Sequence, residues 1–219
     1  MLTRREAQLG LLSAAVLAAA PASFAGTEPE TFPLPPPRST SDRLLLVALK
    51  QRRSTREFSA QALPPQVLSD LLWAAFGVNR PASGDRTAPS WRHSIEIELY
   101  LAMANGVWRY EPRAHALLSH LRQDLRAGTG SQDFVAGAPL NLVYVADGAL
   151  MHGASRDDQR LYASTDTGFI GQNVYLFCAA EGLATVFRGS VDRDVLGRQL
   201  ALPPTKFVTY AQTVGYPKS

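Results

Sequence analysis

A dense group of cationic and hydroxyl side chains lies between residues 50 and 58. Arg52, Arg53 and Arg56 stand there together with Ser54 and Thr55. Guanidinium groups form forked, charge-assisted hydrogen bonds with phosphate oxygens, and a hydroxyl adds a short neutral donor. The segment therefore predicts a binding site for a dianionic phosphate. The alternative interpretation is a solvated basic helix end, which this segment alone does not exclude.

Several other kinds of chemistry lack their usual residues. The sequence has no G-x-S-x-G elbow, no G-x-x-x-x-G-K-[ST] phosphate loop and no G-x-G-x-x-G after a strand. Ser90 and His93 could suggest a nucleophile and its base, but no third orienting group is identifiable. The hydrolase, NTPase and Rossmann classes are therefore disfavoured.

A metal site is also not predicted. Cys178 is the only cysteine, which excludes an intramolecular disulfide and any site with several cysteine ligands. The histidines show no i, i+4 pairing with one another and no ligand spacing with the cysteine. They are His93, His115, His120 and His152.

The composition fits one folded domain that binds a small anion. The chain has 219 residues, 46% of them hydrophobic, which is enough for one sizeable core. Its formal charge of +3 is modest and no long Lys/Arg block is present, so nucleic acid is not an expected partner. Strands and helices are mixed without a repeating βαβ period, which favours the α+β class.

The helices are predicted from apolar periodicity and from capping residues. The first helix, capped by Thr40 or Ser41, carries the basic group at its C-terminal end. The longest and most central helix is expected to end at Gly182, and Asp192 is expected to cap the last one. The predicted ranges are 41–51, 64–76, 116–125, 161–181 and 193–200.

The strands are predicted from alternation and from β-branched runs. Residues 95–103 alternate between apolar and polar, which predicts a strand with one buried face. Asn105-Gly106 is a strong turn signal and leads into a returning strand at 107–110. Further strands are predicted at 140–146, as a central strand, and at 184–187 and 207–214, whereas 79–88 is expected to be a polar loop.

The N-terminal residues predict export. Thr3-Arg4-Arg5 precedes an apolar run from Leu9 to Ala20, and Ser23-Phe24-Ala25 fits a cleavage site. The paired arginines indicate a twin-arginine signal over residues 1–25; an ordinary secretory signal is the alternative. The apolar run is shorter than the roughly 20 residues of a spanning helix, so no stable membrane anchor is expected. We therefore predict a periplasmic or otherwise exported protein.

A proline-rich stretch follows the predicted signal. Residues 29–37 contain five prolines and little that could pack, which predicts an extended tether within a linker at 26–40. The folded domain is then expected to span 41–219.

Four motifs in this order resemble the FMN-dependent nitroreductase family, including its azoline-dehydrogenase-like branch. They are Arg52–Phe58, Arg86–Ser90, the stretch from Gly168-Phe169-Ile170-Gly171-Gln172-Asn173 to Glu181-Gly182-Leu183, and Val214–Pro217. The resemblance covers nearly all of the chain after about residue 40. It implies a mostly antiparallel sheet flanked by helices, with FMN at a homodimer interface.

The resemblance also implies roles for individual residues. Arg52 and Ser54 would bind the FMN phosphate, Arg53 would lie along the ribityl chain, and Arg56 would approach the N1/O2 edge of the isoalloxazine. A fixed cation near N1 stabilises the reduced, anionic flavin. Hydride transfer itself requires no protein acid or base, so no catalytic residue is predicted.

Further contacts to the flavin are implied outside the basic group. Pro89 and Ser90 would reach it from the partner subunit, and the backbone amides of Arg188 and Gly189 would face N5 and O4, where glycine permits close approach. Lys218 would complete the phosphate site. The alternative for Lys218 is a charged chain end without a role.

The sequence departs from the family pattern after Ser90. Many members carry Ser-Ala-x-Asn-x-Gln there, whereas this chain has Trp91, Arg92, His93, Ser94 and Ile95. Trp91 and His93 are therefore candidates for the substrate face, where the indole would stack on an aromatic acceptor. The alternative is that Trp91 belongs to the core.

The function implied is an exported FMN-dependent oxidoreductase acting on a small nitroaromatic, quinone or heterocyclic substrate. NAD(P)H is not freely available outside the inner membrane. We therefore expect either another electron donor in the periplasm or direct oxidation of a substrate by the flavin. A flavin-binding module without turnover is the alternative from a different functional class. An exported structural protein, without any cofactor, is the third.

Overall fold

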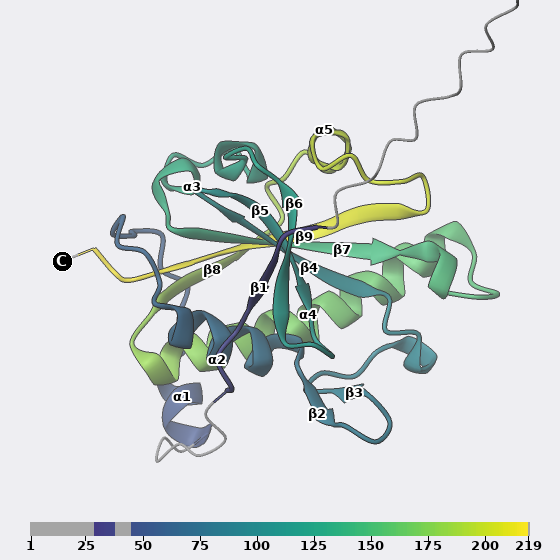
Figure 1. Cartoon of the computed structure of the whole chain (residues 1–219), viewed down its shortest axis with the longest axis horizontal. Coiled ribbons are helices and arrows are strands. Elements are labelled where there is room, and N and C mark those ends of the chain that lie inside the picture. Colours follow the sequence, from purple (N-terminus) through teal and green to yellow (C-terminus); the bar gives the residue numbers. More distant parts are fainter. Residues whose placement is uncertain (1–28, 38–44, 219) are drawn as a thin grey trace, which may run out of the picture.

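The computed structural model describes residues 29–37 and 45–218, and its centre is a seven-stranded antiparallel sheet. The strand order is β1-β6-β5-β4-β7-β9-β8, and each strand runs antiparallel to its neighbours (Figure 1). The strands are β1 (Thr31–Pro33), β4 (Ile97–Met103), β5 (Gly106–Glu111), β6 (Ala116–Leu121), β7 (Leu140–Asp147), β8 (Ala184–Arg188) and β9 (Lys206–Gly215). The predicted α+β class is confirmed.

Helices cover both faces of the sheet. The helices α1 (Leu45–Gln51), α2 (Pro65–Phe76) and α4 (Arg156–Glu181) lie on one side, and α3 (Phe134–Gly137) and α5 (Arg193–Gln199) lie on the other (Figure 1). Short 3-10 turns are η1 (Trp91–His93), η2 (Arg126–Thr129) and η3 (Gly148–Leu150). The sheet is therefore the middle layer of three.

The predicted strand at 95–103 is correct in its alternation but has two buried faces. Ile97, Leu99 and Leu101 belong to the core cluster under α2 and α4. Tyr100 and Ala102 belong to a second cluster, which includes Leu196 and Leu200 at α5. The prediction of a single buried face was wrong because this second apolar cluster packs on the side expected to meet water.

The helix predicted at 116–125 is also wrong, because residues Ala116–Leu121 form β6. This strand pairs with β5 on one side and with β1 on the other. Alanine and leucine favour helices in isolation, but propensity is weak against two neighbouring strands that offer backbone partners.

Part of the predicted tether is built into the sheet. Thr31–Pro33 is β1, at the edge next to β6, and Leu34 is 8% exposed within the core. Proline is tolerated on an edge strand because one side of that strand needs no donor. The stretch is therefore not a free linker over these residues.

The predicted polar loop at 79–88 contains a small hairpin. Its strands are β2 (Val78–Arg80) and β3 (Asp85–Arg86), and Arg80 Nε lies 3.1 Å from Asp85 Oδ2. The predicted signal segment and the Thr40 or Ser41 cap lie outside the described residues. Within the described parts of the chain, no helix is long and apolar enough to cross a membrane.

Helix α4 is the longest element and lies against the sheet, as predicted. It begins five residues earlier than expected, because the Ser155 hydroxyl accepts a hydrogen bond from Asp158 N at 3.1 Å. It ends at Gly182, which has a φ of 70°. This left-handed conformation favours glycine and stops the helix.

Two glycines of α4 provide a matched test of its packing. A Cβ at Gly171 would lie 2.6 Å from the ring of Phe187, whereas a Cβ at Gly168 would meet no atom within 4 Å. We expect Gly171→Ala to lower the free energy of unfolding by about 1–3 kcal/mol through overpacking. Gly168→Ala should raise it by up to about 1 kcal/mol through helix propensity. Urea unfolding measures both, and equal effects would contradict this packing.

Candidate cofactor-binding site

The basic segment is held against α4 and β8. Thr55 N donates to Thr185 O at 2.9 Å, which fixes the backbone to β8. The Ser54 hydroxyl lies 2.7 Å from the Tyr175 hydroxyl, and the Arg52 guanidinium carbon lies 5.1 Å from the Tyr175 ring centroid. Tyr175 of α4 therefore positions two of the predicted phosphate-binding residues.

The hydrogen bonds of Tyr175 leave a donor on Ser54. The Tyr175 hydroxyl accepts a hydrogen bond from Phe187 N at 2.9 Å, so its own proton is available for Ser54 Oγ. Each hydroxyl has one proton and two acceptor lone pairs. When Tyr175 donates to Ser54, the Ser54 proton is free for an oxygen of a ligand.

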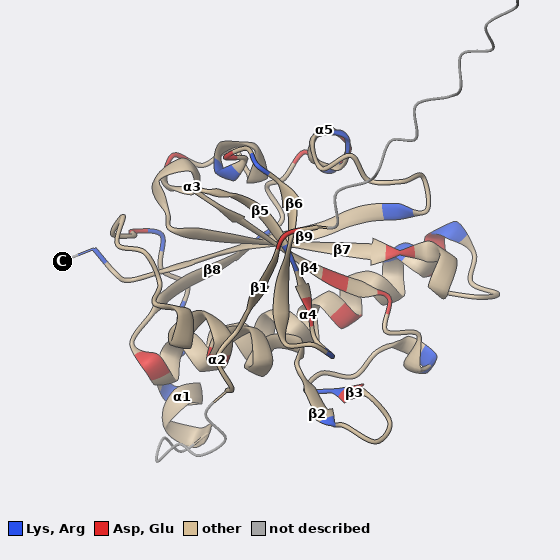
Figure 2. Cartoon of the chain, in the orientation of Figure 1, with Lys and Arg blue, Asp and Glu red and all other residues tan. Residues whose placement is uncertain are grey.

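The C-terminal segment runs beside the basic segment. Phe58 forms a bridge with Pro217, and Lys218 N donates to Glu57 O at 3.3 Å. Figure 2 shows basic positions on the segment after α1 and on the C-terminal segment at the same end of the molecule. The backbone of the exposed Lys218 therefore lies beside Glu57, the residue that follows the exposed Arg56.

Arg188 and Gly189 lie where β8 ends, but they differ in exposure. The Arg188 side chain is 2% exposed and donates to Thr129 O at 2.8 Å, Asn141 Oδ1 at 3.2 Å and Thr213 Oγ1 at 3.0 Å. Burial lowers the pKa of Arg188 to about 10. Its guanidinium is buried and hydrogen-bonded within the core. Only the backbone of Arg188 and Gly189 can therefore contact a ligand.

Gly189 leaves room next to that backbone. The residue is exposed, and a Cβ built on it would meet only Tyr210, at 3.7 Å. Tyr210 packs on Phe187 with a centroid distance of 4.8 Å. An aromatic surface therefore lies beside the exposed glycine.

Pro89, Ser90, Trp91 and His93 lie toward the other end of α4. Trp91 N donates to Asp166 Oδ2 at 2.6 Å, and the indole stacks on Tyr162 at 5.2 Å. Trp91 is half-buried at the margin of the core, so it is neither fully core nor free. Pro89 and His93 are exposed, and Ser90 Oγ accepts from Ile95 N at 3.0 Å.

The two groups of predicted site residues do not meet within one chain. Asp166, under Trp91, and Tyr175, under Ser54, are nine residues apart on α4, which is a rise of about 14 Å. Figure 1 places η1 and the segment after α1 toward opposite ends of this helix. Within one chain, the two groups are therefore too far apart to contact the same small group, such as a phosphate.

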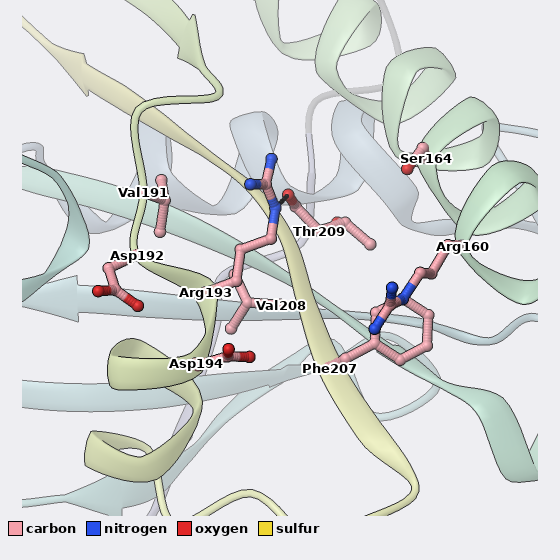
Figure 3. Close-up of a pocket in the computed structure, with 9 residues that line it drawn as sticks. All are labelled: Arg160, Ser164, Val191, Asp192, Arg193, Asp194, Phe207, Val208 and Thr209. Atoms are coloured by element: carbon pink, nitrogen blue, oxygen red, sulfur yellow. Dashed lines mark hydrogen bonds between the residues drawn. The ribbon is translucent and has the colours of Figure 1, made fainter. Parts of the chain in front are cut away.

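A pocket of about 490 Å³ opens on the α4 side near β9. Figure 3 shows Arg160 and Ser164 of α4 facing Val191–Asp194 and Phe207–Thr209. One lining residue, Val191, lies two positions after Gly189, and another, Arg193, has its guanidinium carbon 5.3 Å from the Tyr210 ring centroid. The pocket contains none of the predicted site residues, although it adjoins Gly189 through Tyr210.

Sequence reasoning missed three residues that organise these sites. Tyr175 and Tyr210 had no signal, because an aromatic residue at helical or strand spacing is ordinarily core. Asp166 did carry one: it is an acidic residue within the apolar stripe of α4, between Ala163 and Ile170. A charge in such a stripe requires a buried partner.

The fold and the candidate site define an α+β protein in which a basic segment is held against Tyr175 of α4 and β8, and in which an aromatic pair lies beside the exposed Gly189. Comparison with known families makes this specific: the nitroreductase family model matches residues 49–216, and the chain belongs to that family. Membership indicates an oxidoreductase of a family that generally uses flavin.

Known relatives agree with this membership. A nitroreductase homologue of Methanocaldococcus jannaschii is 31% identical over 152 residues, covering 65% of this chain and 76% of its own. A crystal structure of a Ralstonia eutropha nitroreductase homologue has a TM-score of 0.83 and 41% identity, covering 86% of this chain and 90% of its own. A chain of the Escherichia coli microcin synthetase complex shares the fold, with a TM-score of 0.65 and 19% identity over 95% of this chain and 85% of its own.

Proposed function

We propose that this protein is an exported oxidoreductase that binds FMN and acts on a small nitroaromatic, quinone or heterocyclic molecule. The observation that carries the proposal is the arrangement at Tyr175. There, Arg52 and Ser54 are held in place next to the segment that carries Lys218. A free Ser54 proton and several cations are the donor set that a phosphate monoester requires.

The rest of the site fits the remainder of FMN. Arg53 and Arg56 are exposed, and the ion pairs found among the described residues do not include Arg52, Arg53 or Arg56, which fits a role toward an anionic ligand. Gly189 leaves its backbone open beside Tyr210, as a planar ring would need. When bound, FMN would supply hydride transfer; Arg56 would stabilise the charge near N1, and the Gly189 region would orient the ring.

The proposal includes a homodimer. Several apolar side chains of α1 and α4 are exposed, which disfavours a lone chain in water. They are Leu45, Leu46, Val47 and Leu49 on α1, and Leu161 and Phe169 on α4. In a dimer, the partner subunit would bring its own Pro89 and Ser90 to the flavin.

Export constrains the electron donor. A twin-arginine signal directs the export of proteins that are already folded, so the protein would bind its flavin in the cytoplasm before export. We propose that the mature protein takes electrons from a periplasmic donor other than NAD(P)H, or oxidises a heterocyclic substrate directly. The fold shared with a microcin synthetase chain is compatible with the second possibility. Steady NADPH turnover at the rates of cytoplasmic enzymes would contradict both.

The proposal is tested on the signal-free mature protein by its visible absorption spectrum, identification of released chromophore, and mass by light scattering. We expect FMN in near-stoichiometric amount, bleaching on reduction, and the mass of a dimer. A colourless protein that also fails to take up added FMN would contradict the proposal, and the basic segment would then be an ordinary solvated surface. Flavin that binds but does not turn over any small acceptor would instead favour the binding module.

A further inference from the structure

The segment from Trp91 to Ile95 has a strained backbone. Arg92, His93 and Ile95 have φ values of 48°, 58° and 50°. None is glycine, and for a β-branched residue such as Ile95 the left-handed region is a genuine outlier. Such a conformation persists only when surrounding contacts impose it.

Two carboxyl groups supply those contacts. Trp91 N donates to Asp166 Oδ2 at 2.6 Å. Ser94 Oγ lies 2.6 Å from Trp91 O and 2.7 Å from Glu96 Oε2. Asp166 therefore holds the beginning of the segment, and Glu96 holds its end through Ser94.

The hydrogen-bonding groups around Glu96 and Asp166 indicate that this pair of carboxyls carries one proton. Asp166 Oδ2 accepts from Trp91 N, and Glu96 Oε2 is joined to Trp91 O through Ser94 Oγ, so both carboxyls lie at the same residue. Two carboxylates only accept, so a hydrogen bond between them requires that one of them carries a proton. Glu96 Oε1 is buried and has no donor among the described residues. A proton on Oε1, donated to Asp166, accounts for this otherwise unsatisfied atom.

The surroundings favour the protonated form near neutral pH. Glu96 is 0% exposed. Burial, with the hydrogen bond and negative charge of Asp166, raises the pKa of Glu96 to about 7. From β7, Asp147 offers its backbone N–H to Glu96 O. Arg92 lies over the Trp91 ring and His93 is exposed, and no described cation forms an ion pair with either carboxyl.

We propose that Glu96 and Asp166 share one proton and form a latch that holds the strained Trp91–Ile95 segment while that proton is present. Its loss places two adjacent negative charges inside the protein, which separate and release the segment. The latch itself does not depend on flavin. Its consequence for catalysis does rest on the proposed function: Trp91 and His93, the candidates for the substrate face, lie in the segment, so release would reshape that face near neutral pH.

The test follows the backbone amide of Trp91 by NMR in the full mature protein labelled with 15N-tryptophan, between pH 5 and 9. The chain has three tryptophans, so Trp73 and Trp108 serve as internal controls, and Trp91→Phe assigns the signal. We expect the Trp91 amide to shift with a midpoint near pH 7, while the other two amides stay unchanged. A Trp91 amide that does not titrate, or three that titrate together, would overturn the latch.

Two variants identify the titrating group. In Glu96→Gln, the amide donates to Asp166 at every pH, so the Trp91 signal should keep its low-pH position throughout. Histidine side chains also titrate near neutral pH, so His93→Gln is the control and should retain the wild-type midpoint. A midpoint lost in His93→Gln but kept in Glu96→Gln would refute the assignment. The titration requires no bound flavin, so its result is separate from that of the absorption spectrum.

The latch also predicts a pH dependence of stability. The Glu96 pKa is higher in the folded protein than its ordinary value of 4.5, so the unfolded chain binds fewer protons between the two values. The free energy of unfolding should therefore fall as pH rises toward 7. Urea unfolding at several pH values should show a smaller fall in Glu96→Gln than in the wild type.

Discussion

Replacing Arg188 with methionine is expected to lower the free energy of unfolding by about 2–5 kcal/mol. Two effects oppose each other. The lowered pKa of Arg188, about 10 against 12.5, means that its buried charge costs about 3 kcal/mol, which the variant recovers. Its hydrogen bonds to Thr129 O, Asn141 Oδ1 and Thr213 Oγ1 are worth about 1.5–3 kcal/mol each. Their loss outweighs the recovered cost.

The matched control is Arg193→Met, in the same region of the chain. Arg193 is exposed and donates to a single carbonyl, Thr209 O at 2.8 Å. We expect this variant to lose less than about 1 kcal/mol. Urea unfolding at pH 7 without added flavin measures both. If Arg188→Met were as stable as the wild type but lost flavin, the Arg188 side chain would belong to the cofactor site rather than to the core.

The second large effect is expected at the other end of the proposed FMN site. Arg52→Gln should raise the Kd for FMN by about 10- to 100-fold, because a charge-assisted hydrogen bond to phosphate contributes about 1.5–3 kcal/mol. Tyr175 holds the Arg52 guanidinium in place, so little binding energy is spent on ordering it. Quenching of FMN fluorescence on titration with protein measures the change.

Arg122→Gln removes the same charge at a distant site. Its side chain is 82% exposed and pairs only with Glu30 among the described acidic residues. We expect the Kd for FMN to change less than about twofold, since a distant surface charge is screened by salt. Equal losses in the two variants would mean that net charge attracts the flavin, and that Arg52 does not contact it.

Local sequence signals predicted the elements whose contacts lie within a few residues. The hairpin at Asn105-Gly106, the stop of α4 at Gly182 and the Asp192 cap of α5 are all present. The α+β class followed from their order. Where propensity and pairing disagreed, pairing prevailed, as in β6, which was expected to be a helix.

For the candidate site too, the sequence predicted what depends on residue type and missed what depends on distant contacts. The residue types of Arg52 to Arg56 indicated an anion site, because guanidinium and hydroxyl chemistry is a property of the residues themselves. Sequence could not show that Tyr175 anchors this segment, or that the C-terminal strand brings Lys218 beside it. Both contacts join residues more than 100 positions apart.

The sequence by itself determined the family, the basic segment and those elements that local turn and capping signals mark, because these depend on residue type and short spacing. Only the tertiary structure decided that Arg188 is buried, that Pro89 and Ser90 lie away from the basic segment, and that Glu96 meets Asp166. Each depends on how β8, α4 and β4 pack. Burial and proximity, unlike residue type, arise only when distant segments come together.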